Sequence, residues 1–188
     1  AVVVDAEDRF TTMLAHQLRH LGFATSIVPW SRAAAEADAL AAADIVVAGP
    51  GPGDPRDDGS ARIRAMRDVV AARLDGGRPL LAVCLSHQIL ADRLGLDLAP
   101  LATPHQGLQK TVDVFGEPSS IGFYNTFTAR VNPGTARLGR TEISADGGSG
   151  DVYALRGPGY ASVQGHLESI LSRDGLATLE RLVSWALD

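Results

Sequence analysis

The sequence contains one cysteine, Cys84, and a histidine and a glutamate two residues apart, His166 and Glu168. Nucleophilic catalysis needs a thiolate, a base that moves its proton and a group that orients the base, and these three residues are of those types. A lone cysteine is usually a small buried hydrophobe. Cys84, however, follows an apolar run and precedes an amphipathic stretch. We therefore expect it on a tight strand-to-helix turn, where free N–H groups favour the thiolate.

A second unusual segment, Gly49–Pro55, holds three glycines and three prolines in seven residues. Its backbone N–H groups can face a ligand with no side chain in the way. It lacks the Gly-Lys-Ser/Thr ending of a phosphate-binding loop and the spacing of a dinucleotide-binding turn. The amide of Gly53 and the amide of Leu85 at the helix start are candidates for an oxyanion hole. Each such donor typically contributes about 3 kcal/mol to transition-state stabilisation.

The first half of the chain alternates apolar runs with amphipathic stretches, which predicts an α/β fold with an open, mostly parallel, twisted sheet and flanking helices. The expected strands are Ala1–Asp5, Thr25–Val28, Ile45–Ala48 and Pro79–Val83, and the expected helices are Arg9–Leu21, Ser31–Ala43, Ser60–Leu74 and one after Cys84. Ligand-binding residues in such sheets gather at the carboxyl ends of the strands. Gly49–Pro55 and Cys84 both fall at such ends.

Beyond Leu98 the pattern changes to short runs separated by glycine and proline, which predicts a small antiparallel sheet or hairpins. These runs are Thr111–Phe115, Ser120–Tyr124, Thr128–Val131, Arg140–Ser144 and Val152–Leu155. Ser162–His166 is expected to return to the main sheet, and Gly175–Leu187 to form a closing helix. No linker or repeat divides the sequence, so we expect one domain, residues 1–188.

Composition restricts the classes of protein that fit. The net charge of −5 argues against a nucleic-acid partner or an anionic membrane surface. A single cysteine forms no internal disulfide and no basic-then-apolar leader opens the chain, which together predict a cytoplasmic protein. No stretch approaches the ~20 apolar residues of a membrane span. The first residue, Ala1, is not methionine and falls directly in a strand, which is compatible with a domain of a longer polypeptide and leaves a free subunit as the alternative.

Three motifs in this order resemble those of class I (triad-type) glutamine amidotransferases, which release ammonia from glutamine. The motifs are Gly49–Pro55, Cys84–Gln88 and Val163–Ile170, and the resemblance covers essentially the whole chain. It implies a flavodoxin-like α/β fold, a Cys84–His166–Glu168 triad, a γ-glutamyl thioester on Cys84 and no cofactor in this chain.

The resemblance also implies how L-glutamine is bound. Gln88 and the glycines Gly51 and Gly53 are expected to hold it, together with the backbone of Thr126 and Phe127. Four positions depart from the family's usual residues, where Ala82 and Ser86 replace glycine, Gly165 replaces an aromatic residue and Leu167 replaces proline. We expect the last two changes to loosen the loop that aims His166, and hence low activity until a partner orders the site.

The middle segment is similar to the glutaminase region of chorismate-using synthases, in particular the phenazine-type enzyme that makes 2-amino-2-desoxyisochorismate. Anthranilate synthase glutaminases usually carry Arg-Tyr-His-Ser-Leu where this chain has Gly122–Phe127, with Asn125 and Thr126 in place of His and Ser. The implied partner is a chorismate-binding domain or subunit that receives the ammonia, and Mg²⁺ is expected only in that partner.

Several alternatives stay open. The chain could instead serve anthranilate or aminodeoxychorismate synthase, be a catalytically silent regulatory domain, or be a free-standing cysteine hydrolase such as a peptidase. The intact triad argues against a silent domain. Gln88 and the glycine–proline loop argue against a peptidase. His16 and His20 have a metal-chelating spacing but no third ligand in sequence. We expect His87 to support the turn and Asp5 to cap one.

Overall fold

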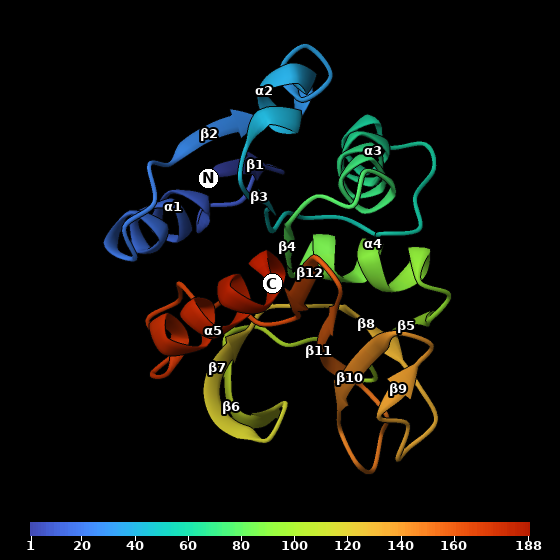
Figure 1. Cartoon of the computed structure of the whole chain (residues 1–188). Coiled ribbons are helices and arrows are strands. Elements are labelled where there is room, and N and C mark those ends of the chain that lie inside the picture. Colours follow the sequence, from blue (N-terminus) through green and yellow to red (C-terminus); the bar gives the residue numbers. More distant parts are fainter.

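A single eight-stranded sheet crosses the molecule in the order β2-β1-β3-β4-β12-β11-β10-β9 (Figure 1). The computed structural model describes residues 1–188. The parallel strands are β1 (Val2–Asp5), β2 (Ser26–Pro29), β3 (Val46–Ala48), β4 (Leu80–Val83) and β12 (Tyr160–Val163). The antiparallel extension consists of β11 (Val152–Gly157), β10 (Thr141–Ala145) and β9 (Arg137–Leu138). The predicted α/β class with a mostly parallel sheet is confirmed.

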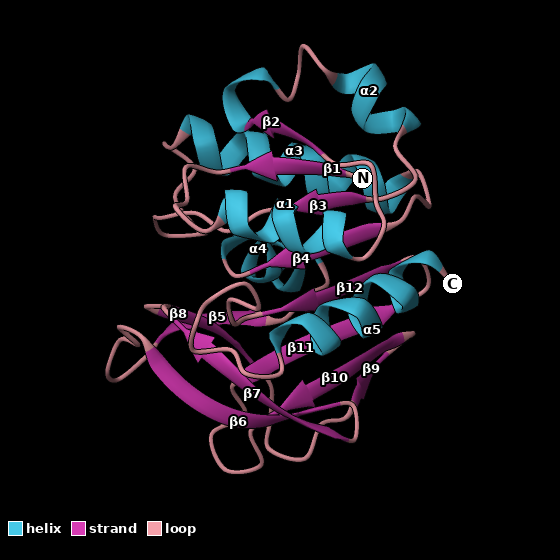
Figure 2. Ribbon diagram, turned by 90° about the vertical axis from the view of Figure 1, so that its left-hand side faces the viewer, coloured by secondary structure: helices cyan, strands magenta, loops and turns pink.

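Helices cover both faces of this sheet (Figures 1 and 2). One face carries α1 (Thr11–His20) and α5 (Gly175–Leu187), and the other carries α3 (Ala61–Asp75) and α4 (Leu85–Arg93). Side chains therefore alternate between two cores, with Val3 and Leu81 on one side and Val4 and Leu80 on the other, all fully buried. Burial on both faces explains why these strands are continuous apolar runs.

The predicted helix Ser31–Ala43 is wrong as a single element. The structure has a 3-10 turn, Trp30–Arg32, and a separate helix α2, Ala37–Ala42. Alanine favours a helix throughout this stretch, but helix propensity is a weak preference that tertiary packing overrides. Only Ala33 and Leu40 are buried against the α3 side, and the Trp30 indole is tied to Glu7 by a hydrogen bond of 2.9 Å.

Two antiparallel ribbons lie beside the main sheet. They pair β5 (Asp97–Pro100) with β8 (Phe127–Arg130), and β6 (Leu108–Val114) with β7 (Glu117–Phe123). The strands β5 and β9 were not predicted, and two of the predicted antiparallel runs, now β10 and β11, extend the main sheet instead of forming a separate one. They do so because β11 pairs with β12, the strand that returns beside β4.

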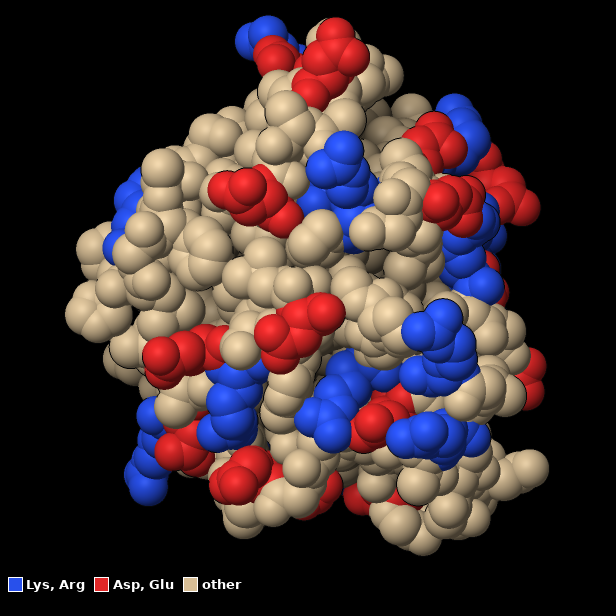
Figure 3. Space-filling model, in the orientation of Figure 1, with Lys and Arg blue, Asp and Glu red and all other residues tan.

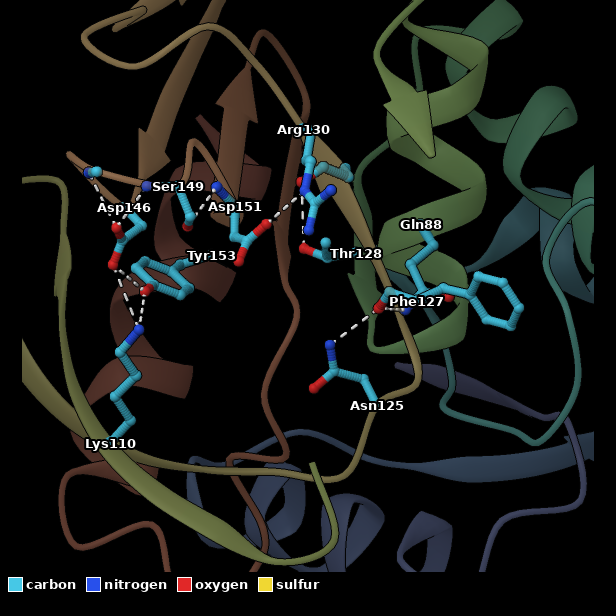
Figure 4. A network of polar contacts seen from close by, with 12 residues as sticks. Gln88, Lys110, Asn125, Phe127, Thr128, Arg130, Asp146, Ser149, Asp151 and Tyr153 are labelled. Atoms are coloured by element: carbon cyan, nitrogen blue, oxygen red, sulfur yellow. Dashed lines mark hydrogen bonds and ion pairs between the residues drawn. The ribbon is translucent and has the colours of Figure 1, made fainter. Parts of the chain in front are cut away.

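A polar cluster fastens β6 to the extended sheet (Figure 4). The ammonium of Lys110 lies 3.3 Å from a carboxylate oxygen of Asp146, and the Tyr153 hydroxyl donates to the same oxygen at 2.8 Å. The backbone N–H of Ser149 and the Tyr153 hydroxyl are the main causes that hold the pKa of Asp146 well below its usual range. The ribbon β6–β7 is thereby held where its continuation, Tyr124–Phe127, reaches the carboxyl edge of the sheet.

Acidic and basic side chains lie interspersed on the face drawn in Figure 3. Ion pairs of the chain include Arg130 with Asp151 at 2.8 Å and Arg156 with Glu142 at 2.7 Å. No helix has both the length and the apolar character needed to cross a membrane.

Arg73 on α3 is 3% exposed and has no carboxylate partner in an ion pair. Its guanidinium donates instead to the carbonyl oxygens of Leu40, Ala43 and Pro79, at distances between 2.7 and 3.2 Å. These bonds cap the C-terminus of α2 and fix the residue that precedes β4. The partial negative charge of the α2 C-terminus attracts the positive guanidinium. Burial, with the nearby charge of Arg78, lowers the pKa of Arg73.

We expect Arg73→Met to lower the free energy of unfolding by about 3 kcal/mol, because it leaves the carbonyl groups of Leu40 and Ala43 without the donor that Arg73 supplies. Urea denaturation measures the change. Arg78→Met is the matched control, since Arg78 is exposed, and it should cost much less. Equal losses in the two variants would contradict the capping role of Arg73.

Candidate active site

The carboxyl ends of β3, β4 and β12 meet at one edge of the sheet and bring the three motifs together. Ala48 pairs with Ala82, and Val83 pairs with Val163, so the residues that follow these strands are neighbours. The backbone N–H of Cys84 continues the ladder by donating to Val163 at 2.9 Å. Parallel pairing thus carries the glycine–proline loop, Cys84 and the His166 segment to the same place.

Cys84 stands on the predicted turn between β4 and α4. Its backbone has φ 53° and ψ −103°, which puts this non-glycine residue in the left-handed half of conformational space. Such strain costs on the order of 1–3 kcal/mol and persists only where the surroundings hold it. The next residue, Leu85, begins α4, so its N–H has no carbonyl of a preceding helical turn to bond. Cys84 is 6% exposed.

Two buried side chains of α4 hold this turn. The Ser86 hydroxyl donates to the carbonyl of Gly49 at 2.8 Å, and the His87 ring lies 2.8 Å through Nδ1 from the Ser162 hydroxyl of β12. Ser86, one of the departures from the family's usual glycine, therefore links the nucleophile turn to the glycine–proline loop. The expected supporting role of His87 is confirmed by this contact.

His166 and Glu168 form a buried pair, each 2% exposed, with Nδ1 of the ring 2.8 Å from Oε1 of the carboxylate. Burial opposes a charge on the ring, but the adjacent Cys84 sulfur and the Glu168 carboxylate outweigh it and raise the pKa of His166 well above its usual range. The rings of Phe10 and Tyr124 pack against the imidazole, with centroids 4.8 and 5.2 Å away.

Backbone hydrogen bonds and core packing hold the loop that carries His166. The N–H of His166 donates to Gly122 at 2.8 Å, and its carbonyl accepts from the N–H of Ser169 at 3.2 Å. Leu167 is fully buried in the main core. At Gly165 a β-carbon would stand 2.3 Å from Cγ2 of Ile121, so this backbone has no room for the family's aromatic residue. In the structure β7 and the core anchor this loop, and a loosening caused by Gly165 and Leu167 stays a prediction.

The glycine–proline loop uses its glycines in different ways. At Gly51 a β-carbon would stand 2.5 Å from the carbonyl oxygen of Ala6, so the loop packs directly on the end of β1. Gly53 has φ +115°, which favours glycine, and its N–H donates to no group of the chain. The free amides of Gly53 and Leu85 are therefore available to a ligand. Their assignment to an oxyanion hole stays a prediction.

Gln88 and the segment Tyr124–Phe127 also meet at this edge (Figure 4). The side-chain nitrogen of Gln88 donates to the carbonyl oxygen of Phe127 at 2.7 Å, and the Asn125 amide donates to the same oxygen at 2.9 Å. Oε1 of Gln88 accepts no hydrogen bond. Thr126 is exposed, and its carbonyl accepts from Leu101 at 2.8 Å.

Arg56 of the loop that follows Pro55 stacks over the Phe127 ring, 4.8 Å from its centroid. Arg56 is itself paired with Asp54 at 2.9 Å. The glycine–proline loop and the segment before β8 are thereby joined beside the site.

Sequence reasoning missed Gln164, Phe10 and the ring contact of Tyr124. Gln164 is 1% exposed, and its side-chain nitrogen lies 3.7 Å from the Cys84 sulfur. Only the register of β4 with β12 reveals this neighbour. Asp5 caps its turn as expected, since one carboxylate oxygen accepts from the N–H groups of Glu7 and Asp8 at 3.0 and 3.1 Å. No three His, Cys, Asp or Glu side chains are placed to hold a metal ion.

The chain is similar to known proteins over its whole length. The family description "Glutamine amidotransferase class-I" matches residues 2–184. The phenazine-specific anthranilate synthase of Pseudomonas fluorescens is 43% identical over 189 residues, which cover 99% of this chain and 29% of that protein. Aminodeoxychorismate synthase component 2 of Klebsiella aerogenes is 30% identical over 183 residues, 93% of this chain and 94% of that one.

Among solved structures, a putative GMP synthase component from Thermoplasma acidophilum superposes with a TM-score of 0.79 at 18% identity, covering 98% of this chain and 92% of that one. This likeness establishes the fold. The chain spans less than a third of the phenazine-specific relative, 29% of its length.

Acid should destabilise the protein partly through His87. Full burial lowers the pKa of His87 to about 4, below the ordinary value of about 6.5. Between these values the unfolded chain binds a proton that the folded chain does not, so stability falls as pH falls, by up to about 1.4 kcal/mol per pH unit. Urea denaturation at pH 7, 6 and 5 should show a shallower decline in His87→Gln than in the parent. Parallel declines would contradict this.

Proposed function

Because the chain belongs to the class I glutamine amidotransferase family, we propose that it hydrolyses L-glutamine to glutamate and delivers the ammonia to a chorismate-using synthase domain. The observation that carries this proposal is the strained Cys84 turn beside the buried His166–Glu168 pair. A silent regulatory domain would have no use for strain at a thiol. We propose residues 1–188 as one glutamine amidotransferase domain.

The triad supplies each step of the proposed reaction. The raised pKa of His166 favours an imidazolium next to the Cys84 sulfur. A positive charge in that place activates a cysteine nucleophile. The thiolate attacks the side-chain carboxamide carbon of glutamine, and the N–H groups of Leu85 and Gly53 stabilise the oxyanion. His166 gives its proton to the departing ammonia, leaving a γ-glutamyl thioester. Neutral His166 then takes a proton from a water molecule that hydrolyses the thioester, while Glu168 orients the ring.

Glutamine recognition is assigned to the groups around Gln88. Its free Oε1 can accept from an N–H of the substrate, because its nitrogen is already used by the Phe127 carbonyl. The backbone of Thr126 and Phe127 and the loop at Gly51 and Gly53 are proposed to complete the subsite. A thiolate nucleophile must stay reduced, which suits the cytoplasm.

The synthase that we propose as partner is of the phenazine type. Support comes from the 43% identity to the phenazine-specific anthranilate synthase and from Asn125 in place of the usual histidine. The relative at 30% identity keeps aminodeoxychorismate synthase as the second candidate. Mass spectrometry of the product formed from chorismate and glutamine distinguishes the phenazine-type synthase from aminodeoxychorismate synthase. We propose that Mg²⁺ binds only in the partner synthase.

Cys84→Ala should abolish glutamine-dependent product in the protein that contains both the chain and its synthase. Synthesis from added ammonium salt should survive, because the acceptor chemistry does not use the thiol. Product formation from each nitrogen source is the measurement. Glutamine hydrolysis at the parent rate in this variant would remove Cys84 from the role of nucleophile.

The chain alone should hydrolyse glutamine slowly, because Cys84, Gln88 and His166 are 6% exposed or less and the substrate must open the site. Joining the chorismate-binding partner should raise kcat/KM for glutamine on the order of tenfold or more. Glutamate release with and without the partner measures this. Equal turnover in the two states would show that the site opens without help.

A further inference from the structure

We propose that Gln164 is a positioning residue that holds the Cys84 thiolate and Gln88 through its carboxamide. The inference rests on the proposed function and adds to it a residue outside the triad. Val163 pairs with Val83 in the parallel ladder, and the next residues along the chain, Gln164 and Cys84, therefore lie side by side. The side chain of Gln164 is 1% exposed, so its polar atoms must find partners within the protein.

Both ends of this carboxamide have partners. Nε2 donates to the Cys84 sulfur at 3.7 Å, and Oε1 accepts from the side-chain nitrogen of Gln88 at 3.0 Å. The nitrogen of Gln88 also donates to the carbonyl of Phe127 at 2.7 Å. A continuous chain of hydrogen bonds therefore runs from a backbone carbonyl to the sulfur.

The Phe127 carbonyl determines the direction of the whole chain. A carbonyl oxygen only accepts, so Gln88 must turn its nitrogen toward it. Gln164 must then present its oxygen to Gln88, which leaves its nitrogen facing Cys84. Flipping either amide would set two donors or two acceptors against each other in a buried place. An N–H group is thereby held toward the sulfur by the fold itself.

A donor aimed at sulfur stabilises the thiolate over the thiol, because hydrogen bonds to charged acceptors are stronger than those to neutral ones. The donor acts in addition to His166. The same carboxamide fixes the orientation of Gln88 and so leaves its Oε1 for the substrate. One residue thus couples the nucleophile to the glutamine subsite.

The test measures alkylation of Cys84 by iodoacetamide across pH, with the Cys84 peptide quantified by mass spectrometry. Gln164→Met keeps the side-chain length without donor or acceptor. It should move the midpoint of the alkylation profile to higher pH. It should also slow the labelling of Cys84 at neutral pH about tenfold, which is the effect of one hydrogen bond to a charged group. Gln109→Leu is the matched control, since Gln109 is exposed and bonds only the Leu171 carbonyl. It should keep the parent profile.

A double-mutant comparison tests the coupling. Gln88→Met should slow alkylation in the parent background and have little further effect in Gln164→Met. A parent-like alkylation profile in folded Gln164→Met overturns the proposal. If Gln164→Met does not fold, Gln164→Asn takes its place in the test. This variant keeps the amide but holds it one methylene farther from the sulfur. It must shift the midpoint of the alkylation profile to higher pH in the same way. Alkylation uses no glutamine, so this result is independent of whether the chain proves to be a glutaminase.

Discussion

The parallel pairing of β4 with β12 is the constraint on which the whole site depends. The pairing is continued past the strands by the bond from the Cys84 N–H to Val163. A slip of one residue would turn the side chains that follow β12 to the opposite face of the sheet. Ser162 would then lose its hydrogen bond with His87, and Gln164 would lose its hydrogen bond with the Cys84 sulfur. The buried side chains on both faces make such a slip costly, so the two cores that stabilise the fold also fix the geometry of the site.

Strain at Cys84 is maintained by contacts on every side of the turn. The ladder bond holds its backbone from β12, and Ser86 and His87 hold the first turn of α4 from the glycine–proline loop and from β12. The strained conformation lifts the thiol to the end of the sheet and leaves the Leu85 amide free. Stability and chemistry are therefore supplied by the same few hydrogen bonds.

Local patterns in the sequence were sufficient for the central strands, for α3 and for the turn at Cys84. Each of these depends on residues close together in the chain. The interruption of Ser31–Ala43 depends instead on packing against α3. The joining of β10 and β11 to the main sheet depends on which distant strand pairs with which. Periodicity does not encode such pairings, so the contact of Gln164 with Cys84 and the packing of Phe10 on His166 emerge only from the structure.

The close contact between Gly165 and Ile121 has a consequence for how such sequences diverge. A β-carbon at position 165 would stand 2.3 Å from Ile121 Cγ2. A lineage that acquires the family's aromatic residue here must first reduce the side chain at position 121 or shift β7. A lineage with glycine is free to keep the branched residue. Positions 121 and 165, far apart in the chain, are thus expected to change together, and the order of their substitutions is restricted.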